Sequence, residues 1–170
     1  MNYAIIENGI VSNIVVASEA LADNWVASQT AAIGDHYAAG VFTRPEPATP
    51  APTSADVDAE RDRRIDAGLT FNGVQFQSRA ADRENINGKA LQAYMAIAAG
   101  AQPGDLRWAN AEQDFAWIAS DNSLIPMDAQ TVIEFGNAAA AHKEAHIFAA
   151  RRLKDMNQIP DDFTADSWWP

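Results

Sequence analysis

A proline-rich segment at residues 44–55 divides the chain and limits how its parts can fold. It reads Arg-Pro-Glu-Pro-Ala-Thr-Pro-Ala-Pro-Thr-Ser-Ala, and its four prolines lack the amide hydrogen that helices and sheets need. This composition favours extended polyproline geometry and a fairly stiff spacer. We therefore expect an N-terminal module at residues 1–43, a linker at 44–55 and a C-terminal module at 56–170.

The start of the N-terminal module predicts a β-hairpin. Two runs rich in β-branched residues, 3–7 and 10–16, are separated by Asn8-Gly9, a pair that suits the positive φ angles of a type I′ turn. A second short strand pair is expected around His36-Tyr37 and Val41-Phe42, turning at Gly40.

Between these strand pairs the sequence predicts a helix from about Glu19 to Ala31. Ser18 would cap it, and Leu21, Trp25 and Val26 would supply one buried face. The module would then be a small α+β attachment unit.

The C-terminal module begins with a highly charged helix, predicted over Asp56–Ala67 and capped by Thr53 or Ser54. Glu60 reaches Arg64 at the four-residue spacing of an ion pair. Val57 and Ile65 supply most of the apolar surface, so we expect this helix to lie at a surface or between chains. If it self-associates, the charged pair would form a polar rim around them, as in a symmetric homo-oligomer.

The rest of this module predicts a hairpin, short strands and two longer helices, which makes the fold class α+β. Asn72-Gly73 closes a hairpin that pairs Phe71 with Val74 and Leu69 with Phe76. The other expected elements are a helix over Ala80–Ala99, with a stripe formed by Ile86, Ala90, Leu91, Tyr94, Met95 and Ile97, strands at Leu106–Trp108 and Phe115–Ala119, and a helix over Ala129–Met156 capped by Asp128.

Composition and charge narrow the classes of function. The chain has no cysteine, so it can form no disulfide. Its net charge of −11 repels a phosphate backbone, so nucleic-acid partners are not expected. The first residues lack the basic start and apolar run of a signal peptide, and no segment approaches the apolar length of a membrane-spanning helix. We expect a protein made in a reducing cytoplasm, without a membrane partner.

Several spaced motifs resemble a tail-protein domain of tailed bacteriophages whose function is unassigned. They are Arg61-Asp62-Arg63-Arg64-Ile65, Phe71-Asn72-Gly73-Val74-Gln75-Phe76-Gln77-Ser78, Asp82-Arg83-Glu84-Asn85-Ile86 and Pro126-Met127-Asp128-Ala129-Gln130, and the resemblance covers roughly residues 57–170. The opening hairpin is similar to that of small proteins encoded near tail-fibre genes. The resemblance implies a role in the virion tail, with the protein made in the host bacterial cytoplasm, and it brings no catalytic residues.

One histidine pair could serve chemistry. His142 and His146 lie four residues apart, on one face of the last predicted helix, as two imidazoles must to share a metal. A zincin motif would need Glu where Lys143 stands, and apolar residues share this face, so packing in a core or against a partner is the favoured interpretation. We assign no catalytic, cofactor-binding or metal residues.

The expected function is a structural or adapter protein that works through contacts with other tail proteins of the fibre, tail tip or baseplate. An assembly chaperone of the tail fibre is the alternative, and a metal-dependent enzyme is the third hypothesis. Trp168 and Trp169 point apart in an extended chain, so one could anchor a partner while the other folds back. The candidate partner-binding residues are Tyr3, Trp25, Val57, Ile65, Trp168 and Trp169.

Overall fold

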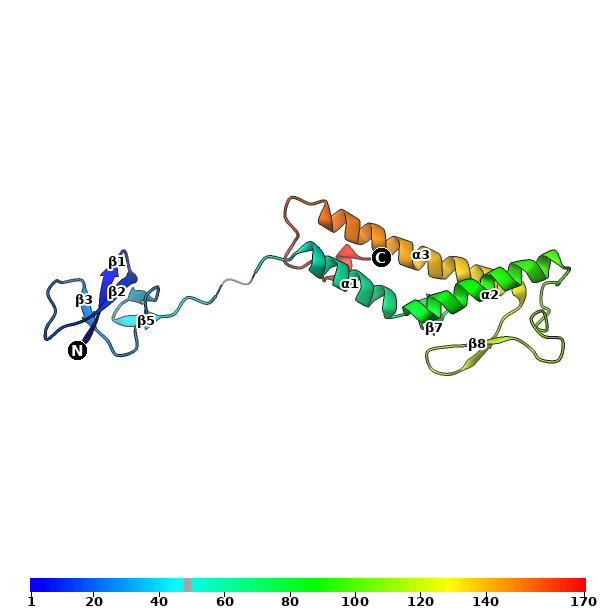
Figure 1. Cartoon of the computed structure of the whole chain (residues 1–170), viewed down its shortest axis with the longest axis horizontal. Coiled ribbons are helices and arrows are strands. Elements are labelled where there is room, and N and C mark those ends of the chain that lie inside the picture. Colours follow the sequence, from blue (N-terminus) through cyan, green and yellow to red (C-terminus); the bar gives the residue numbers. More distant parts are fainter. Residues whose placement is uncertain (48–49) are drawn as a thin grey trace. The chain divides into compact units, whose positions relative to one another are not determined.

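The computed structural model describes residues 1–47 and 50–170, which form an α+β fold (Figure 1). Residues 48 and 49, within the predicted linker, lie outside the described residues. The chain divides into two compact units, Met1–Pro50 and Ala51–Pro170, and the division falls inside the proline-rich segment. No helix in the described parts is both long enough and apolar enough to cross a bilayer.

The N-terminal unit is a five-stranded antiparallel sheet in the order β3-β1-β2-β4-β5. Its centre is the predicted hairpin of β1 (Asn2–Glu7) and β2 (Ile10–Val16), with Asn8 and Gly9 at φ angles of 53° and 78°. The predicted second pair is also confirmed, as β4 (His36–Ala38) and β5 (Val41–Thr43). The buried apolar residues of this unit are Tyr3, Ala4 and Val11.

The helix predicted over residues 19–31 is wrong. Trp25–Ala27 instead form strand β3, which pairs antiparallel with β1. Asn24 fixes the start of this pairing, because its carbonyl accepts from the Ile6 amide at 2.9 Å and its side-chain amide donates to the Ile6 carbonyl at 3.0 Å. A helix of this length is only marginal alone, whereas β1 offers an unpaired edge that suits the aromatic and β-branched residues.

The C-terminal unit contains three helices and two hairpins. Helices α2 (Ala80–Ala98) and α3 (Ala129–Lys154) pack on each other, and α1 (Ser54–Asp66) packs on α3 (Figure 1). The predicted caps hold: Thr53 caps α1 and Asp128 caps α3. The hairpins are β6 (Leu69–Phe71) with β7 (Val74–Phe76), and β8 (Ala116–Ile118) with β9 (Leu124–Pro126).

Phe135 on α3 is the centre of the larger core. Its ring lies 4.7 Å from that of Phe76 and 5.4 Å from those of Phe71 and Trp117. The predicted β6–β7 register, which brings Phe71 and Phe76 to this core, is confirmed. The strand predicted at residues 106–108 is wrong, because this segment forms turns; Trp108 still packs on the core and donates to the Met127 carbonyl at 3.0 Å.

Candidate functional site

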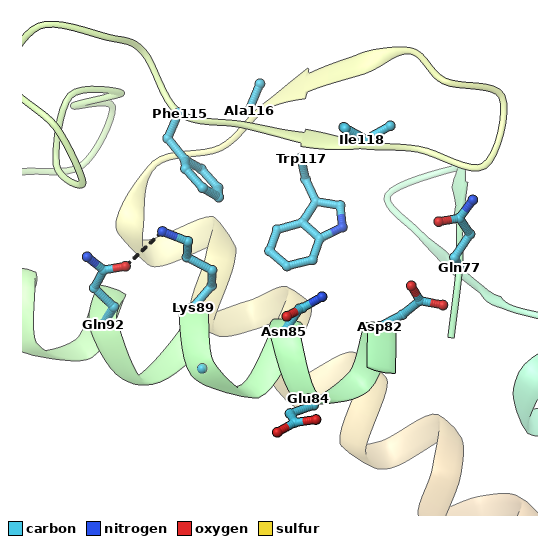
Figure 2. A pocket seen from close by; sticks show the side chains of 11 residues that line it. Gln77, Asp82, Glu84, Asn85, Lys89, Gln92, Phe115, Ala116, Trp117 and Ile118 are labelled. Atoms are coloured by element: carbon cyan, nitrogen blue, oxygen red, sulfur yellow. Dashed lines mark hydrogen bonds between the residues drawn. The ribbon is translucent and has the colours of Figure 1, made fainter. Parts of the chain in front are cut away.

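A groove of about 520 Å³ runs between β8 and helix α2 (Figure 2). Phe115 and Trp117 form its aromatic wall, because alternate side chains of the β8 segment point toward α2. Lys89 on α2 closes one end: its ammonium lies 5.3 Å from the centroid of the Phe115 ring and donates to Gln92 at 2.8 Å. Asp82 and Gln77 border the other end.

Gly88 contributes to the α2 side of this groove. A β-carbon added there would have no described atom within 4 Å. Glycine within a helix costs about 1 kcal/mol relative to alanine. Packing within the described residues gives no reason for this glycine, which leaves the helix backbone uncovered at this position.

The edge of β8 on the side away from β9 has free backbone groups. The Met127 amide donates to the Phe115 carbonyl at 3.2 Å, and the Ala119 amide donates to the Ser123 carbonyl at 2.9 Å. In an antiparallel ladder every second residue pair is hydrogen-bonded, so the pair between those at residues 115 and 119 is bonded as well. Trp117 therefore exchanges backbone hydrogen bonds with Ile125, its register partner. The amides and carbonyls of Ala116 and Ile118 therefore point away from β9, and among the described strands none pairs with them.

Helix α2 also presents an apolar stripe to solvent. Leu91, Tyr94 and Met95 are 63%, 65% and 63% exposed, and Ala98 continues the same face at helical spacing. This corrects the stripe predicted for α2: Ile86 and Ala93 are its buried residues, while Leu91, Tyr94, Met95 and Ile97 are exposed. The helix therefore has two apolar faces, and α3 with the hairpins covers one.

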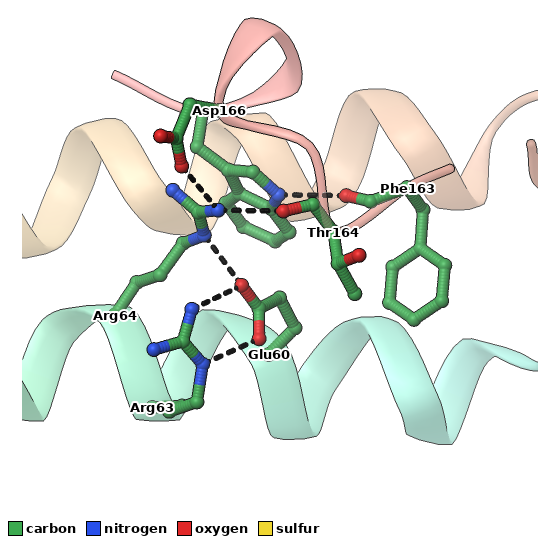
Figure 3. A network of polar contacts seen from close by, with 7 residues as sticks. Glu60, Arg63, Arg64, Phe163, Thr164 and Asp166 are labelled. Atoms are coloured by element: carbon green, nitrogen blue, oxygen red, sulfur yellow. Dashed lines mark hydrogen bonds and ion pairs between the residues drawn. The ribbon is translucent and has the colours of Figure 1, made fainter.

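A polar network ties the end of the chain to α1 (Figure 3). Arg63 and Arg64 both bind the carboxylate of Glu60 at 2.6 Å, and Arg64 also donates to the Thr164 carbonyl at 2.7 Å and to Asp166 at 2.8 Å. The pKa of Glu60 is lowered, chiefly by the hydrogen bond from Arg63, with burial opposing and Arg64 adding to the shift. The network fixes residues 163–166 against the helix.

Val57 and Ile65 are not at a surface, which corrects the expectation that α1 shows them to a partner. They are 0% and 2% exposed, and Val57 packs with Ala149, Leu153 and Trp169. The charged composition of α1 did not indicate this burial, because only Val57 and Ile65 among its apolar residues are covered by the rest of the unit. The Glu60–Arg64 pair is real, yet it faces the chain's own tail instead of surrounding a contact between copies.

Both terminal tryptophans pack on the same apolar cluster, which corrects the extended-chain argument, because Asp166–Trp168 form a 3₁₀ turn. Trp169 folds back: it is 7% exposed, donates to the Phe163 carbonyl at 2.8 Å and lies under Arg64 at 5.3 Å. Trp168 is half-buried and donates to Asp162 at 3.2 Å. In the other unit, Tyr3 is largely buried, and its ring centroid lies 6.2 Å from that of the half-buried Trp25. Partner contacts of Tyr3, Trp25 and Trp168 remain predictions.

His142 and His146 lie in contact on α3, with ring centroids 4.5 Å apart. His146 is buried, its Nδ1 lies 2.8 Å from the His142 carbonyl, and its ring stacks on Trp169, which confirms core packing for this residue. Burial lowers the pKa of His142, and the neighbouring His146 adds to this, while the carbonyls of Ile65 and Arg64 act in the opposite sense. Within the described residues, no third histidine or carboxylate completes a metal-binding group with them.

Sequence reasoning did not identify the β8 groove. Its parts were visible only singly: a glycine inside a predicted helix at Gly88 and aromatic residues at Phe115 and Trp117. Their assembly depends on how the β8–β9 hairpin lies over α2, which no local pattern encodes.

The C-terminal unit is therefore a small α+β domain with an open strand edge, an exposed helix stripe and a clamped tail. Residues 48–167 match the family described as Domain of unknown function (DUF4376), and the chain belongs to this family. No curated protein and no solved structure matches the chain.

Proposed function

We propose that this protein is an adapter of a bacteriophage tail, working through protein–protein contacts of its two units. The observation that carries the contact function is the exposed stripe of Leu91, Tyr94, Met95 and Ala98 on α2. Contiguous exposed apolar side chains on a soluble domain mark interaction sites, and tyrosine and methionine are enriched in interfaces.

The division into two units supports an adapter. Each unit has its own pairing scheme or core: the N-terminal sheet involves residues 2–43, and the two apolar clusters of the other unit involve residues 57–169. Separate units on one chain can hold two partners. The assignment to a phage tail depends on the motif resemblance of residues 57–170, since the family itself carries no assigned function.

The experiment is quantitative mass spectrometry of purified particles from a lysate that produces the protein. A fixed ratio to the known tail proteins is expected. Adding two negative charges to the stripe, by Leu91→Glu with Met95→Glu, should lower this ratio by roughly tenfold or more, as the loss of an interface anchor does.

Asn157→Glu with Gln158→Glu is the matched control, because it adds the same two charges at exposed positions outside the stripe and should leave the ratio unchanged. Absence from particles, with abundant protein bound to the fibre in the lysate, would instead identify an assembly chaperone. Absence from both would refute the tail assignment.

A further inference from the structure

We propose that the open edge of β8 accepts an extended segment of a partner protein as an added antiparallel strand. The inference deepens the adapter function proposed above by naming the chemistry of one partner, a peptide in β conformation. Main-chain hydrogen bonds give such complexes affinity, and pockets for alternate side chains give them specificity.

The direction of the backbone groups supports this occupant. Ala116 and Ile118 direct their amides and carbonyls away from β9, as the alternating ladder requires. The next residue with the same parity, Ser120, already uses this edge: its amide donates to the Gln75 carbonyl of β7 at 2.9 Å. A strand placed beside Ala116 and Ile118 would continue the pairing that Ser120 begins.

The two edges of the hairpin are protected differently. Pro126 of β9 pairs with Ala116. An amide at this position would point away from β8, and proline has none, so the outer edge of β9 lacks a donor there. Proline on an edge strand is a common device against unwanted pairing. β8 has no proline, so its outer edge is not protected in this way, and its Ile118 is 55% exposed.

The groove offers apolar contact and charge to a strand placed beside β8. Gly88 is one of its lining residues on α2, and the aromatic wall of Phe115 and Trp117 offers apolar contact to side chains that point inward. The Lys89 ammonium marks the Phe115 end, and the Asp82 carboxylate, which also pairs with Arg79 at 3.1 Å, marks the Ile118 end. An antiparallel segment therefore fits best with a basic residue near its start and an acidic residue near its end.

The test uses the full chain labelled with ¹⁵N and a synthetic peptide, acetyl-Lys-Thr-Val-Thr-Val-Thr-Glu-amide, at millimolar concentration. We expect saturable shifts of the Ala116 and Ile118 amides and of the Trp117 indole. The same peptide N-methylated at alternate residues, so that it cannot form a ladder, should cause none of them.

Ile118→Pro removes the outward amide without changing a β8–β9 hydrogen bond and should abolish the peptide shifts. Leu124→Pro is the matched control, because it changes the outer edge of β9 and should leave binding intact. If Ile118→Pro does not fold, Gly88→Leu tests the same groove, since Gly88 lines it and a leucine side chain there would occupy its open space and should weaken peptide binding.

Binding that survives both Ile118→Pro and Gly88→Leu would overturn the proposal, as would the absence of shifts with the unmodified peptide. The same shifts on raising the protein concentration without peptide would overturn it in favour of a second copy as the occupant. Incorporation into particles separates the two proposals. If Ile118→Pro is incorporated at the same ratio to the tail proteins as the wild type, the adapter function stands without strand addition. If the protein binds the peptide but is absent from particles, strand addition stands without the adapter function.

Discussion

The carboxylate of Glu60 lies 2.6 Å from the guanidinium of Arg64, one turn later on α1, and the two side chains are only 9% and 13% exposed. Arg64 continues this contact to the backbone of Thr164, one hundred positions later. The pair therefore joins the first helix of the C-terminal unit to its last residues, and its energetics can be tested directly.

Glu60→Gln should destabilise the C-terminal unit by about 3 kcal/mol, because it leaves the largely buried guanidinium of Arg64 with only the exposed carboxylate of Asp166 as an ionic partner. Denaturant unfolding followed by tryptophan fluorescence measures this change. The control is Asp155→Asn, which breaks the exposed pair with Arg151 and should cost less than about 1 kcal/mol. Equal losses in both variants would show that burial of the pair is immaterial.

Trp169→Ala should cost about 3 kcal/mol or more, because the indole fills the cluster of Val57, Ala149 and Leu153. Its neighbour provides the comparison: Trp168→Ala removes a half-buried ring and should cost clearly less. The free energy of unfolding of both variants decides the order, and a larger effect at Trp168 would contradict the packing described above.

Stability should fall on mild acidification through His142. Its pKa is lowered in the folded chain, so the unfolded chain binds more protons once the pH drops below the ordinary histidine value of about 6.5. The free energy of unfolding should therefore be highest above that pH and decrease from pH 7 toward pH 5. His142→Gln should flatten this slope and the exposed His36→Gln should preserve it; an unchanged slope in the first variant would refute the assignment.

Gly68→Ala should be strongly destabilising, by about 3 kcal/mol or more, since steric strain adds to the cost of a left-handed backbone. Gly68 has a φ of +109°, and a β-carbon there would lie 2.5 Å from the Phe76 carbonyl oxygen. Gly100 has a similar φ of +105° with no described atom within 4 Å, so Gly100→Ala isolates the backbone term at about 1 kcal/mol. Thermal unfolding of the pair measures the difference, and equal shifts would show that the contact with β7 relaxes freely.

Ser78→Ala should stabilise the protein by about 1 kcal/mol. The hydroxyl of Ser78 is fully buried and has no hydrogen-bond partner among the described residues, so its removal relieves a desolvation cost. Ser123→Ala gives the opposite case, because that hydroxyl donates to Asp121 at 2.6 Å. A loss of stability in Ser78→Ala would point to a buried water or ligand at this hydroxyl.

Local signals predicted the two Asn-Gly turns and the caps of α1 and α3 correctly, whereas the cap predicted at Ser18 belongs to a helix that does not form. Asn8-Gly9 and Asn72-Gly73 favour one turn geometry whatever surrounds them, and Asp128 and Thr53 cap helices through contacts within their own turns. The four-residue spacing likewise predicted the Glu60–Arg64 pair. Each of these features depends on neighbours in the sequence.

Features that depend on distant partners were not predicted. The segment around Trp25 is a strand because the edge of β1 is available to it, and Val57 is buried because α3 and Trp169 cover it. The apolar stripe predicted for α2 includes residues that are exposed in the structure, since periodicity identifies an apolar face and does not say what lies against it. The β8 groove was missed for the same reason.

The clamp between Arg64 and Asp166 also imposes an order on synthesis. These residues are separated by 102 positions, so the cluster around Val57 cannot close on a ribosome until the tail has been made. The N-terminal sheet pairs strands that are close in the chain, and it can form long before that point. During synthesis the N-terminal sheet can therefore fold first, and α1 gains its last contacts only when residues 164–169 have been made.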